Sequence, residues 1–384
     1  MKRSTNRILT THAGSLPRPL PLLERMREKL SGRPYDEKAY AAAVTSAVSD
    51  SIARQAETGI DVLADGEMSK PGFFTYAKQR LAGFEERPGT KFALFEKEVE
   101  EFPDYYKDYF ARAMLGGSVA NPIPLVCTGP IKYIGMEALQ TDLANLKAAL
   151  ANNRHVEAFV PSTAPSGVGT NEYYKTDDEF FEALGQAMRE EYKAIVDAGF
   201  IVQIDDPFLS DICYDLRDDK KALIHKAGLY VESINHALRD IPADRVRFHT
   251  CYGINEGPRL HEAALAEVAP YMFRIKAQAF SFEMANVRHE HEYHLFESFK
   301  IPDGTILIPG VIAHGSSMIE HPELVAERIM RLANIVGREN VIAGADCGFS
   351  SQATFKPEVD PKAMWLKFGS MVEGARIASE RLWR

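Results

Sequence analysis

The sequence predicts an α/β fold, a (β/α)8 TIM barrel formed by residues 1–384 as one catalytic domain with an inserted segment. Short apolar runs alternate with longer amphipathic stretches, which is the pattern of parallel strands followed by helices. Polar side chains end many of the short runs, and a barrel gathers all strand ends on one face. The glycine-rich phosphate turn of a doubly wound sheet is missing, so the barrel is favoured over that alternative.

The predicted strands are short runs rich in apolar and β-branched residues. They cover residues 8–14, 62–67, 124–130, 157–162, 200–205, 246–252, 273–283, 305–312 and 340–347. A (β/α)8 barrel has eight strands, so at least one of these nine runs is expected to lie outside the barrel. The predicted helices repeat apolar positions at three- and four-residue spacing. They cover residues 40–59, 141–152, 177–199, 218–238, 322–337 and 365–382.

Residues from about 84 to 123 interrupt this alternation with an aromatic and charged stretch. A stretch of this length after the second predicted strand indicates an insertion rather than a simple loop. We expect it to form an inserted helical lid over the site or a contact between copies of the chain in a homo-oligomer.

Charge and composition exclude several partners. The net charge is −9 and the pI is about 5.7, and no basic stripe is present to bind nucleic acid or an anionic membrane. No apolar stretch reaches the length of a membrane span or of a signal-peptide core. The chain is therefore expected in the cytoplasm, where its cysteines stay reduced. Cys127 and Cys213 are expected to be small buried residues without a chemical role.

His249 and Cys251 are two residues apart on a predicted strand, in the segment RFHTCYG. Side chains at this spacing point to the same side, which is the interior of a barrel. Imidazole and thiolate both bind zinc, although such a pair alone is more often part of a core. Glu283 and Cys347 end two later strands. Together the four residues predict a zinc site built from three strands, as suits a catalytic metal.

Motifs along nearly the whole chain resemble the cobalamin-independent methionine synthase family, specifically its catalytic C-terminal zinc barrel. They are TTHAGSLPRP at 10–19, VLADGE at 62–67, VQIDDP at 202–207, HTCYG at 249–253, FSFE at 280–283, PGVIAHGS at 309–316 and ADCG at 345–348. The resemblance implies zinc-dependent transfer of an alkyl (methyl) group to a homocysteine-type thiol, with a zinc-bound thiolate as nucleophile. The activity would be similar to that of a 5-methyltetrahydropteroyltriglutamate–homocysteine S-methyltransferase in methionine biosynthesis.

The resemblance also assigns roles to particular residues. It implies that Zn²⁺ is held by His249, Cys251, Glu283 and Cys347. It implies that the thiol substrate is bound by Gly14, Ser15, Glu67 and Asp205. It implies that the proton donor to the leaving group is His314. This side chain titrates near neutrality in its ordinary state, and the alternative is a structural histidine that caps the next helix.

The chain departs from the complete synthase in two respects. It is expected to contain one barrel, whereas the complete synthase has a second, N-terminal barrel. The tryptophan that the family uses against the folate has no counterpart, since Trp365 and Trp383 both lie near the C-terminus. The alkyl donor therefore stays open. Stretches such as GPIKYIGMEALQTD at 129–142 and FSFEMANVRHEHE at 280–292 are similar to a short single-barrel branch, the epoxyalkane:coenzyme M transferases.

Charge at the predicted site bears on the choice of thiol. Glu67 and Asp205 suit the ammonium of an amino-acid thiol and disfavour the sulfonate of coenzyme M, although Arg18 or Lys132 would reverse this balance. A further histidine cluster is more often a solvated charged run than a metal site, and its members are His289, His291 and His294.

Three functions follow. The leading one is a methionine-synthase-like S-methyltransferase, and the second is an alkyltransferase that opens an epoxide with a zinc-bound thiolate. The third is a non-catalytic barrel that binds zinc and a thiol. The two enzyme hypotheses predict that His314→Asn abolishes turnover while the metal content is retained, and the non-catalytic hypothesis does not.

Overall fold

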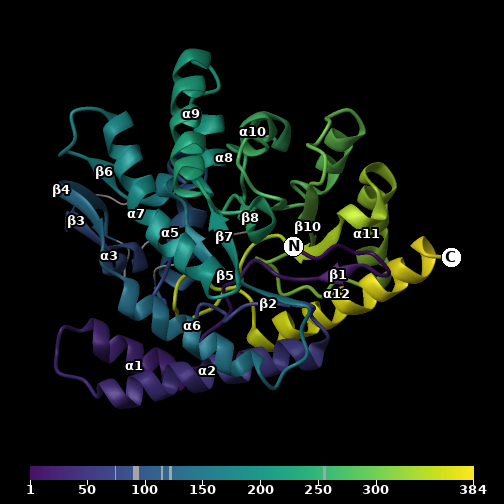
Figure 1. The fold of residues 1–384 in the computed structure, drawn as a ribbon, viewed down its shortest axis with the longest axis horizontal. Coiled ribbons are helices and arrows are strands. Elements are labelled where there is room, and N and C mark those ends of the chain that lie inside the picture. The colour runs from purple at the N-terminus through teal and green to yellow at the C-terminus, as the bar shows by residue number, and fades with distance from the viewer. Residues whose placement is uncertain (74, 90–94, 114–115, 121–122, 254–256) are drawn as a thin grey trace.

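The computed structural model describes residues 1–73, 75–89, 95–113, 116–120, 123–253 and 257–384. Eight strands form one parallel sheet in the order β1-β11-β10-β9-β8-β7-β5-β2. They are β1 (Leu9–Thr10), β2 (Val62–Leu63), β5 (Glu157–Thr163), β7 (Ile201–Asp205), β8 (Val246–His249), β9 (Ala279–Phe282), β10 (Ile306–Ile312) and β11 (Ile342–Ala345). The sheet ends meet where the Asp61 N–H donates to the Thr10 carbonyl at 3.1 Å. The predicted (β/α)8 barrel is confirmed (Figure 1).

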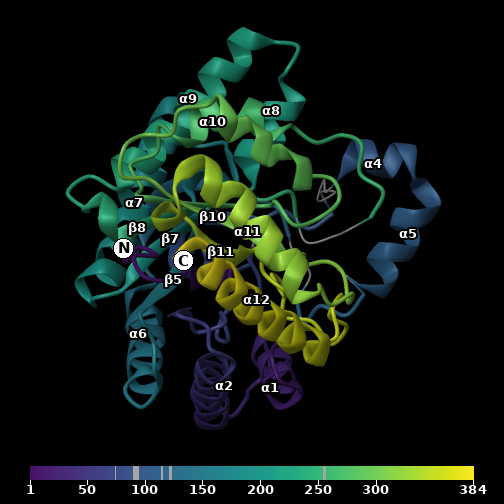
Figure 2. The ribbon, with the colours of Figure 1, turned by 90° about the vertical axis from the view of Figure 1, so that its right-hand side faces the viewer.

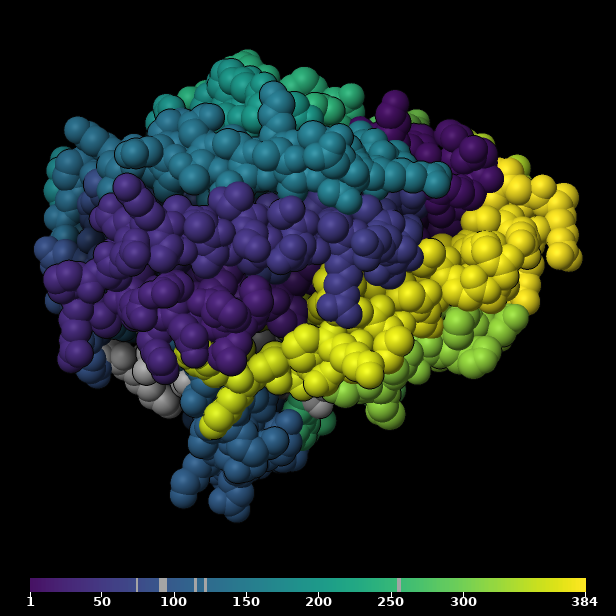
Figure 3. All heavy atoms as spheres, turned by 90° about the horizontal axis from the view of Figure 1, so that it is seen from below, coloured from purple at the N-terminus to yellow at the C-terminus, as the bar shows by residue number. Residues whose placement is uncertain are grey.

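Helices surround the barrel, as the apolar spacing predicts. They are α1 (Leu20–Leu30), α2 (Glu37–Thr58), α6 (Met136–Leu150), α7 (Asp177–Asp197), α8 (Phe208–Asp215), α9 (Lys220–Ala237), α10 (Leu265–Met272), α11 (Pro322–Val336) and α12 (Pro361–Leu382). Helix α2 packs against α1, α6 and α12, which lie along one side of the molecule (Figure 3). Gly59 ends α2 in the left-handed conformation with a φ of 95°. Within the described residues, no helix combines the length and apolarity needed to cross a membrane.

One of the nine predicted strands lies outside the barrel. Residues 124–130 fall in β4 (Leu125–Tyr133), which pairs antiparallel with β3 (Leu81–Glu86) and parallel with β6 (Thr170–Asn171) in a separate three-stranded sheet. Only the start of β4 is fully buried, and the remainder is partly exposed. A strand of the barrel is covered on both faces, so this pattern belongs to a small sheet at the edge of the fold.

The segment after β2 that the sequence predicts to be an insertion is only partly helical. Its first residues, 84–86, belong to strand β3 rather than to a helix, because this strand pairs with β4 on the return path. The helices α4 (Glu96–Glu101) and α5 (Pro103–Arg112) are in this segment, whereas α3 (Tyr76–Arg80) precedes it. Figure 2 shows α4 and α5 on the outside of the molecule, at the right. The parts of the prediction that concern residues 90–94, 114–115 and 121–122 lie outside the described residues.

Buried polar residues fill the interior of the barrel below the strand ends. Arg247 of β8 is fully buried, donates to Thr11 Oγ1 at 3.1 Å and to the His12 carbonyl at 2.9 Å, and lies 4.0 Å above the Phe159 ring. These contacts fix β8 against the opposite wall. Because residues two apart share a face of a strand, His249 points into the same interior as Arg247.

Candidate metal centre and substrate cavity

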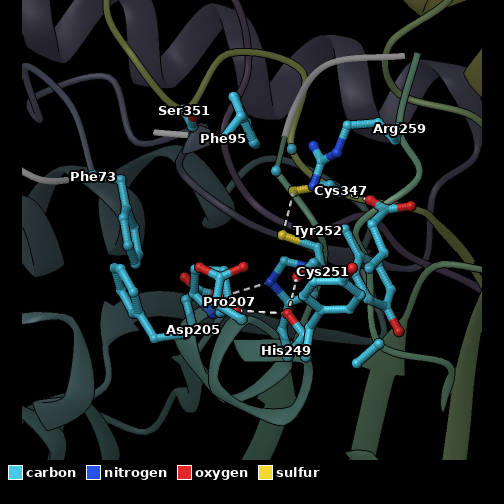
Figure 4. A pocket seen from close by; sticks show the side chains of 18 of the residues that line it. Phe73, Phe95, Asp205, Pro207, His249, Cys251, Tyr252, Arg259, Cys347 and Ser351 are labelled. Carbon is cyan, nitrogen blue, oxygen red and sulfur yellow. Dashed lines mark hydrogen bonds and ion pairs between the residues drawn. The ribbon is translucent and has the colours of Figure 1, made fainter. Parts of the chain in front are cut away.

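Three of the predicted metal ligands meet at the carboxyl ends of β8 and β11. His249 is the last residue of β8, and Cys251 follows it by two positions. Cys347 follows the end of β11 by two positions. Their ligand atoms all lie within 4.8 Å of one another, and the two sulfurs are 3.1 Å apart (Figure 4). A buried imidazole and two thiols at this separation can share one ion.

Asp205, the last residue of β7, fixes the orientation of His249. Its Oδ1 lies 2.8 Å from His249 Nδ1 and also accepts a hydrogen bond from Gln203 Nε2 at 2.7 Å. Burial lowers the pKa of His249, but the hydrogen bond to Asp205 and the charges of Cys251 and Asp205 together outweigh it, and the net pKa is raised. The second ring nitrogen, Nε2, is buried and has no hydrogen-bond partner among the described residues. A histidine held in this way through one nitrogen presents the other to a metal.

The two cysteines have the chemistry of a soft metal site. Their mutual hydrogen bond and their burial raise the pKa of Cys347 well above its ordinary value. The thiol of Cys347 is therefore protonated in the absence of a cation, and a divalent ion that binds thiolate would displace this proton. Two sulfurs and an open imidazole nitrogen fit Zn²⁺, whereas Mg²⁺ and Ca²⁺ prefer oxygen ligands.

Glu283, the fourth predicted ligand, lies in an adjoining buried group. It follows strand β9, and its carboxylate accepts hydrogen bonds from the Tyr252 N–H at 2.9 Å and from Asn286 Nδ2 at 2.8 Å. Its oxygen clusters within 4.8 Å with atoms of His314 and Asp346 rather than with the two sulfurs. Burial raises the pKa of Glu283. The structure thus brings three of the four residues together and holds the fourth in the neighbouring cluster.

His314, the predicted proton donor, follows β10 and is buried in the same cluster as Glu283. Its Nε2 lies 3.0 Å from the Gly253 carbonyl, while Nδ1 is buried without a hydrogen-bond partner among the described residues. Burial lowers its pKa to about 4, against the opposing charge of Asp346. The expectation that it titrates near neutrality is therefore not met, because burial outweighs the nearby carboxylate. The side chain that caps the next helix, α11, is His321 instead.

Two of the predicted thiol-binding residues, Gly14 and Glu67, lie next to each other, whereas Ser15 lies beside Gly348 and Asp205 beside His249. Gly14 has a φ of 128°, and a Cβ atom there would lie 2.6 Å from Pro161 Cγ and 3.1 Å from Glu67 Oε1. A side chain at this position would therefore be excluded. Glu67 itself has a φ of 57°, and its N–H donates to Asp65 Oδ1 at 2.8 Å. Burial raises the pKa of Glu67, and the charge of Lys70 opposes this.

One cavity of about 390 Å³ connects these groups. Its inner wall contains the thiol-binding and metal-binding candidates Ser15, Glu67, Asp205, His249, Cys251 and Cys347. Its outer wall includes Phe95–Glu98 of the insertion and Arg259 from the chain between β8 and α10. Phe73 and Phe208 form a stacked pair in the wall, with ring centroids 6.2 Å apart (Figure 4).

Sequence reasoning missed Arg259 and named two other cations instead. Arg18 donates through its terminal nitrogens to the carbonyls of Glu67 and Lys70, at 2.8 and 2.9 Å, and does not line the cavity. Lys132 is exposed on β4, in the small sheet. Neither residue therefore offers a charge to a ligand in the cavity. Arg259 stands in a loop without a motif, and no local signal in the sequence identifies it.

The second histidine cluster is a set of ion pairs. His289 Nδ1 lies 2.8 Å from Glu292 and its Nε2 lies 3.4 Å from Glu262, while its ring stacks on Tyr252 with centroids 4.1 Å apart. Burial lowers the pKa of His289, but the hydrogen bonds to the two glutamates raise it to about 9. His291 and His294 are exposed. Among the described residues, the three histidines do not group as metal ligands.

The fold and the position of the cavity define a (β/α)8-barrel protein with its polar site at the carboxyl ends of the strands. The chain belongs to the family described as cobalamin-independent synthase, catalytic domain, whose model matches residues 163–360. This membership places it among methyltransferases.

Named relatives agree with this assignment. The chain is 27% identical to a methionine synthase of Sulfolobus acidocaldarius over 381 residues, covering 97% of this chain and 93% of that protein. It is 26% identical to a methionine synthase of Saccharolobus islandicus, covering 98% and 96% of the two chains.

Two solved structures share the fold. A B12-independent methionine synthase from a Shewanella species, in complex with selenomethionine, has a TM-score of 0.70 at 18% identity and covers 98% of this chain and 99% of its own. A putative vitamin-B12 independent methionine synthase from Listeria monocytogenes has a TM-score of 0.66 at 21% identity, with coverage of 97% and 99%.

Proposed function

We propose that this protein is a zinc-dependent S-methyltransferase that transfers a methyl group, or another alkyl group, to a homocysteine-type thiol. The relatives named methionine synthases support the acceptor and the product. The observation that carries the proposal is the buried, unpartnered Nε2 of His249 beside two cysteine sulfurs. A buried nitrogen that lacks a partner is rare, and a bound metal would supply one.

Zinc would be held by His249, Cys251 and Cys347, with Glu283 as the fourth ligand. When bound, it supplies a positive charge that keeps a substrate thiol in its thiolate form near neutral pH. The protein side chains orient these ligands. Asp205 orients the imidazole of His249 through the hydrogen bond between its Oδ1 and His249 Nδ1. This carboxylate oxygen would therefore contact the metal ligand rather than the substrate.

Glu67 and Ser15 would bind the thiol acceptor. Glu67 has a buried carboxylate on the cavity wall, which suits the ammonium of an amino-acid thiol. Ser15 adds a hydroxyl that can donate or accept a hydrogen bond. Gly14 leaves room for the carboxylate of Glu67, because a Cβ at this position would lie 3.1 Å from Glu67 Oε1.

His314 would hold and release the proton that the leaving group needs. Its Nε2 is engaged by the Gly253 carbonyl, so the open Nδ1 is the atom at which a proton would be carried. With a pKa of about 4 the ring is neutral near pH 7, and the nearby charge of Asp346 favours its protonated form.

The residues that line the cavity do not identify the alkyl donor. The described residues that line it include no tryptophan, and Trp365 instead packs on Phe368 of α12. The flat surface that a folate would require would instead come from phenylalanine and tyrosine side chains of the lining, among them the stacked pair Phe73 and Phe208. An epoxide remains the alternative alkyl donor, as the similarity to the coenzyme M branch implies.

Product analysis tests the proposed function. Zinc-loaded protein is incubated with homocysteine or coenzyme M and with methylfolate, methylcobalamin or an epoxide, and the thioether is sought by mass spectrometry. Methionine from homocysteine is the expected product. A thioether formed only from coenzyme M and an epoxide would favour the alternative, and no thioether with any pair would contradict both.

Metal analysis tests the proposed cofactor. We expect about one zinc per chain, lost in Cys347→Ala and retained in Cys127→Ala. The second variant is a matched control because Cys127 is a buried cysteine outside the cavity. A stable and active protein without metal would refute the mechanism.

A further inference from the structure

Arg259 brings to the cavity a cation whose hydrogen-bonding capacity is only partly used. Its side chain is 4% exposed, and its Nη2 lies 2.9 Å from Glu262 Oε1. The ring of Phe95 lies 4.3 Å from the centre of the guanidinium. Nε and Nη1 are buried and make no hydrogen bond with any described residue, and Nε lies 3.8 Å from Glu98 Oε1. A guanidinium has five N–H donors, so the two donors of Nη1 lack an acceptor among the described residues.

The open nitrogen is close to the proposed metal ligands. Arg259 Nη1 lies 3.7 Å from the position that a Cβ on Gly253 would take. Gly253 is two residues after Cys251, a separation that spans roughly 7 Å at most along the chain. Figure 4 shows the Arg259 side chain extending into the same cavity as Cys251 and Cys347. A small molecule can therefore contact the guanidinium and the sulfur site together.

The charges around Arg259 leave its open donors available. Glu262 is shared, because Arg288 and His289 also contact it. Burial raises the pKa of Glu262, but the hydrogen bond to His289 and the nearby arginines lower it to about 2. The glutamate therefore stays ionised, and its negative charge is already balanced by the neighbouring cations. Lys97, the other long cation that lines the cavity, is half exposed and pairs with Asp215 at 3.0 Å.

We propose that Arg259 binds the acidic group of the acceptor, and that the acceptor is a thiol with a carboxylate or a sulfonate at its other end. Two oxygens of such a group match the fork of a guanidinium, which binds them more strongly than neutral partners. The thiol part of this inference rests on the proposed function. The anion-binding part stands on Arg259 itself, since a buried charged donor needs an acceptor.

Titration of matched thiols tests the inference. The zinc-loaded protein is titrated in a calorimeter with 3-mercaptopropionate and 2-mercaptoethanesulfonate, which carry an acid, and with 2-mercaptoethanol, which does not. We expect the acidic thiols to bind about 10- to 100-fold more tightly, the range for charge-assisted hydrogen bonds. Arg259→Gln is expected to remove this difference, and Arg259→Lys to keep part of it because a point charge replaces the fork.

A matched variant controls for the loss of a buried arginine. Arg328 is also buried, contacts Glu290 at 2.9 Å, and lies outside the cavity, so Arg328→Gln is expected to bind all three thiols as the wild type does. Circular dichroism checks that each variant is folded. If Arg259→Gln keeps the preference for acidic thiols, or if the wild type has none, the inference is wrong.

Acids without sulfur separate this inference from the proposed function. Propionate and ethanesulfonate are titrated into wild type and Arg259→Gln. Binding that disappears in the variant supports the anion site even if no thioether is ever formed. Equal binding of these acids to both proteins overturns the anion site and leaves the proposed thiol chemistry untouched.

Discussion

The Oδ1 atom of Asp205 lies 2.8 Å from Nδ1 of His249, and the two residues are register partners on the neighbouring strands β7 and β8. Register partners on parallel strands point to the same face, so short side chains suffice to join them. The backbone register of the barrel thereby determines which nitrogen of His249 is free. This links the sheet directly to the chemistry of the proposed metal site.

Removal of the Asp205 carboxylate is expected to weaken metal binding. Asp205→Ala leaves the imidazole without its orienting acceptor, and we expect zinc affinity to fall about 10- to 100-fold. Competition with a chromogenic chelator measures this change. Asp215→Ala is the control, because Asp215 also lines the cavity but pairs with exposed Lys97. Equal affinity in Asp205→Ala and wild type would mean that the hydrogen bond has no part in holding the metal.

Replacement of His314 is expected to separate turnover from metal binding. His314→Asn should lower kcat by about 10²- to 10⁴-fold through loss of the proton donor, with zinc content unchanged. The rate of thioether formation and the zinc content are measured on the same preparation. His291→Asn, at an exposed histidine, is expected to keep full activity. An unchanged rate in His314→Asn would exclude the proton-donor role.

The two active-site sulfurs are expected to form a disulfide when metal is removed. Cys251 Sγ and Cys347 Sγ are 3.1 Å apart, so little movement is needed to reach a bond of about 2.05 Å. Diamide, which takes up the two electrons and two protons of the thiols, should consume two thiols per chain in chelator-treated Cys127→Ala. Thiol counting with a chromogenic disulfide measures this, and zinc-loaded protein should be protected. The same loss with and without zinc would contradict a shared metal site.

His12 is expected to make stability depend on pH in the acid range. Burial and the nearby charge of Arg247 lower its pKa from 6.5 to about 4, although the hydrogen bond between Nε2 and Gln55 opposes this. Below pH 6.5 the unfolded chain takes up a proton that the folded chain does not, so stability is full above this pH and is lost as pH falls toward 4. The loss between pH 7.5 and pH 5 should be about 2 kcal/mol.

Urea unfolding of wild type and His12→Gln at both pH values measures the effect of His12. The variant should be less stable at pH 7.5 and should lose about 2 kcal/mol less on acidification. His155→Gln, at an exposed histidine, should keep the pH dependence of the wild type. Parallel pH profiles of wild type and His12→Gln would contradict the assignment.

The barrel could be predicted because each strand and helix has its own periodic pattern, and because parallel strands carry their end residues to one face. This logic placed His249, Cys251 and Cys347 together. It could not identify residues 124–130 as the run outside the barrel, because β4 begins with the buried run Leu125–Cys127 and looks locally like a barrel strand. Its antiparallel partner β3 is what assigns it to another sheet, and pairing is not a local property.

Other features depend on contacts that the sequence alone does not specify. The pKa of His314 is set by its burial, which no motif records. Asp205 could be predicted at the site, but its bond to His249 depends on the register of β7 against β8. Arg259 comes from a loop, and its neighbour Phe95 comes from the insertion, so their meeting requires the whole fold.

The buried carboxylate of Glu98 on α4 accepts backbone N–H groups of Leu260 at 2.9 Å and His261 at 2.7 Å. The insertion is thereby fastened to the loop that carries Arg259, while the proposed metal ligands lie at or just after the ends of the strands. In the proposed function, the metal site and the arginine that binds the acidic group therefore lie in separate parts of the chain. Exchange of α4 and this loop could then alter the size or charge of the accepted molecule with the proposed zinc-binding residues left intact.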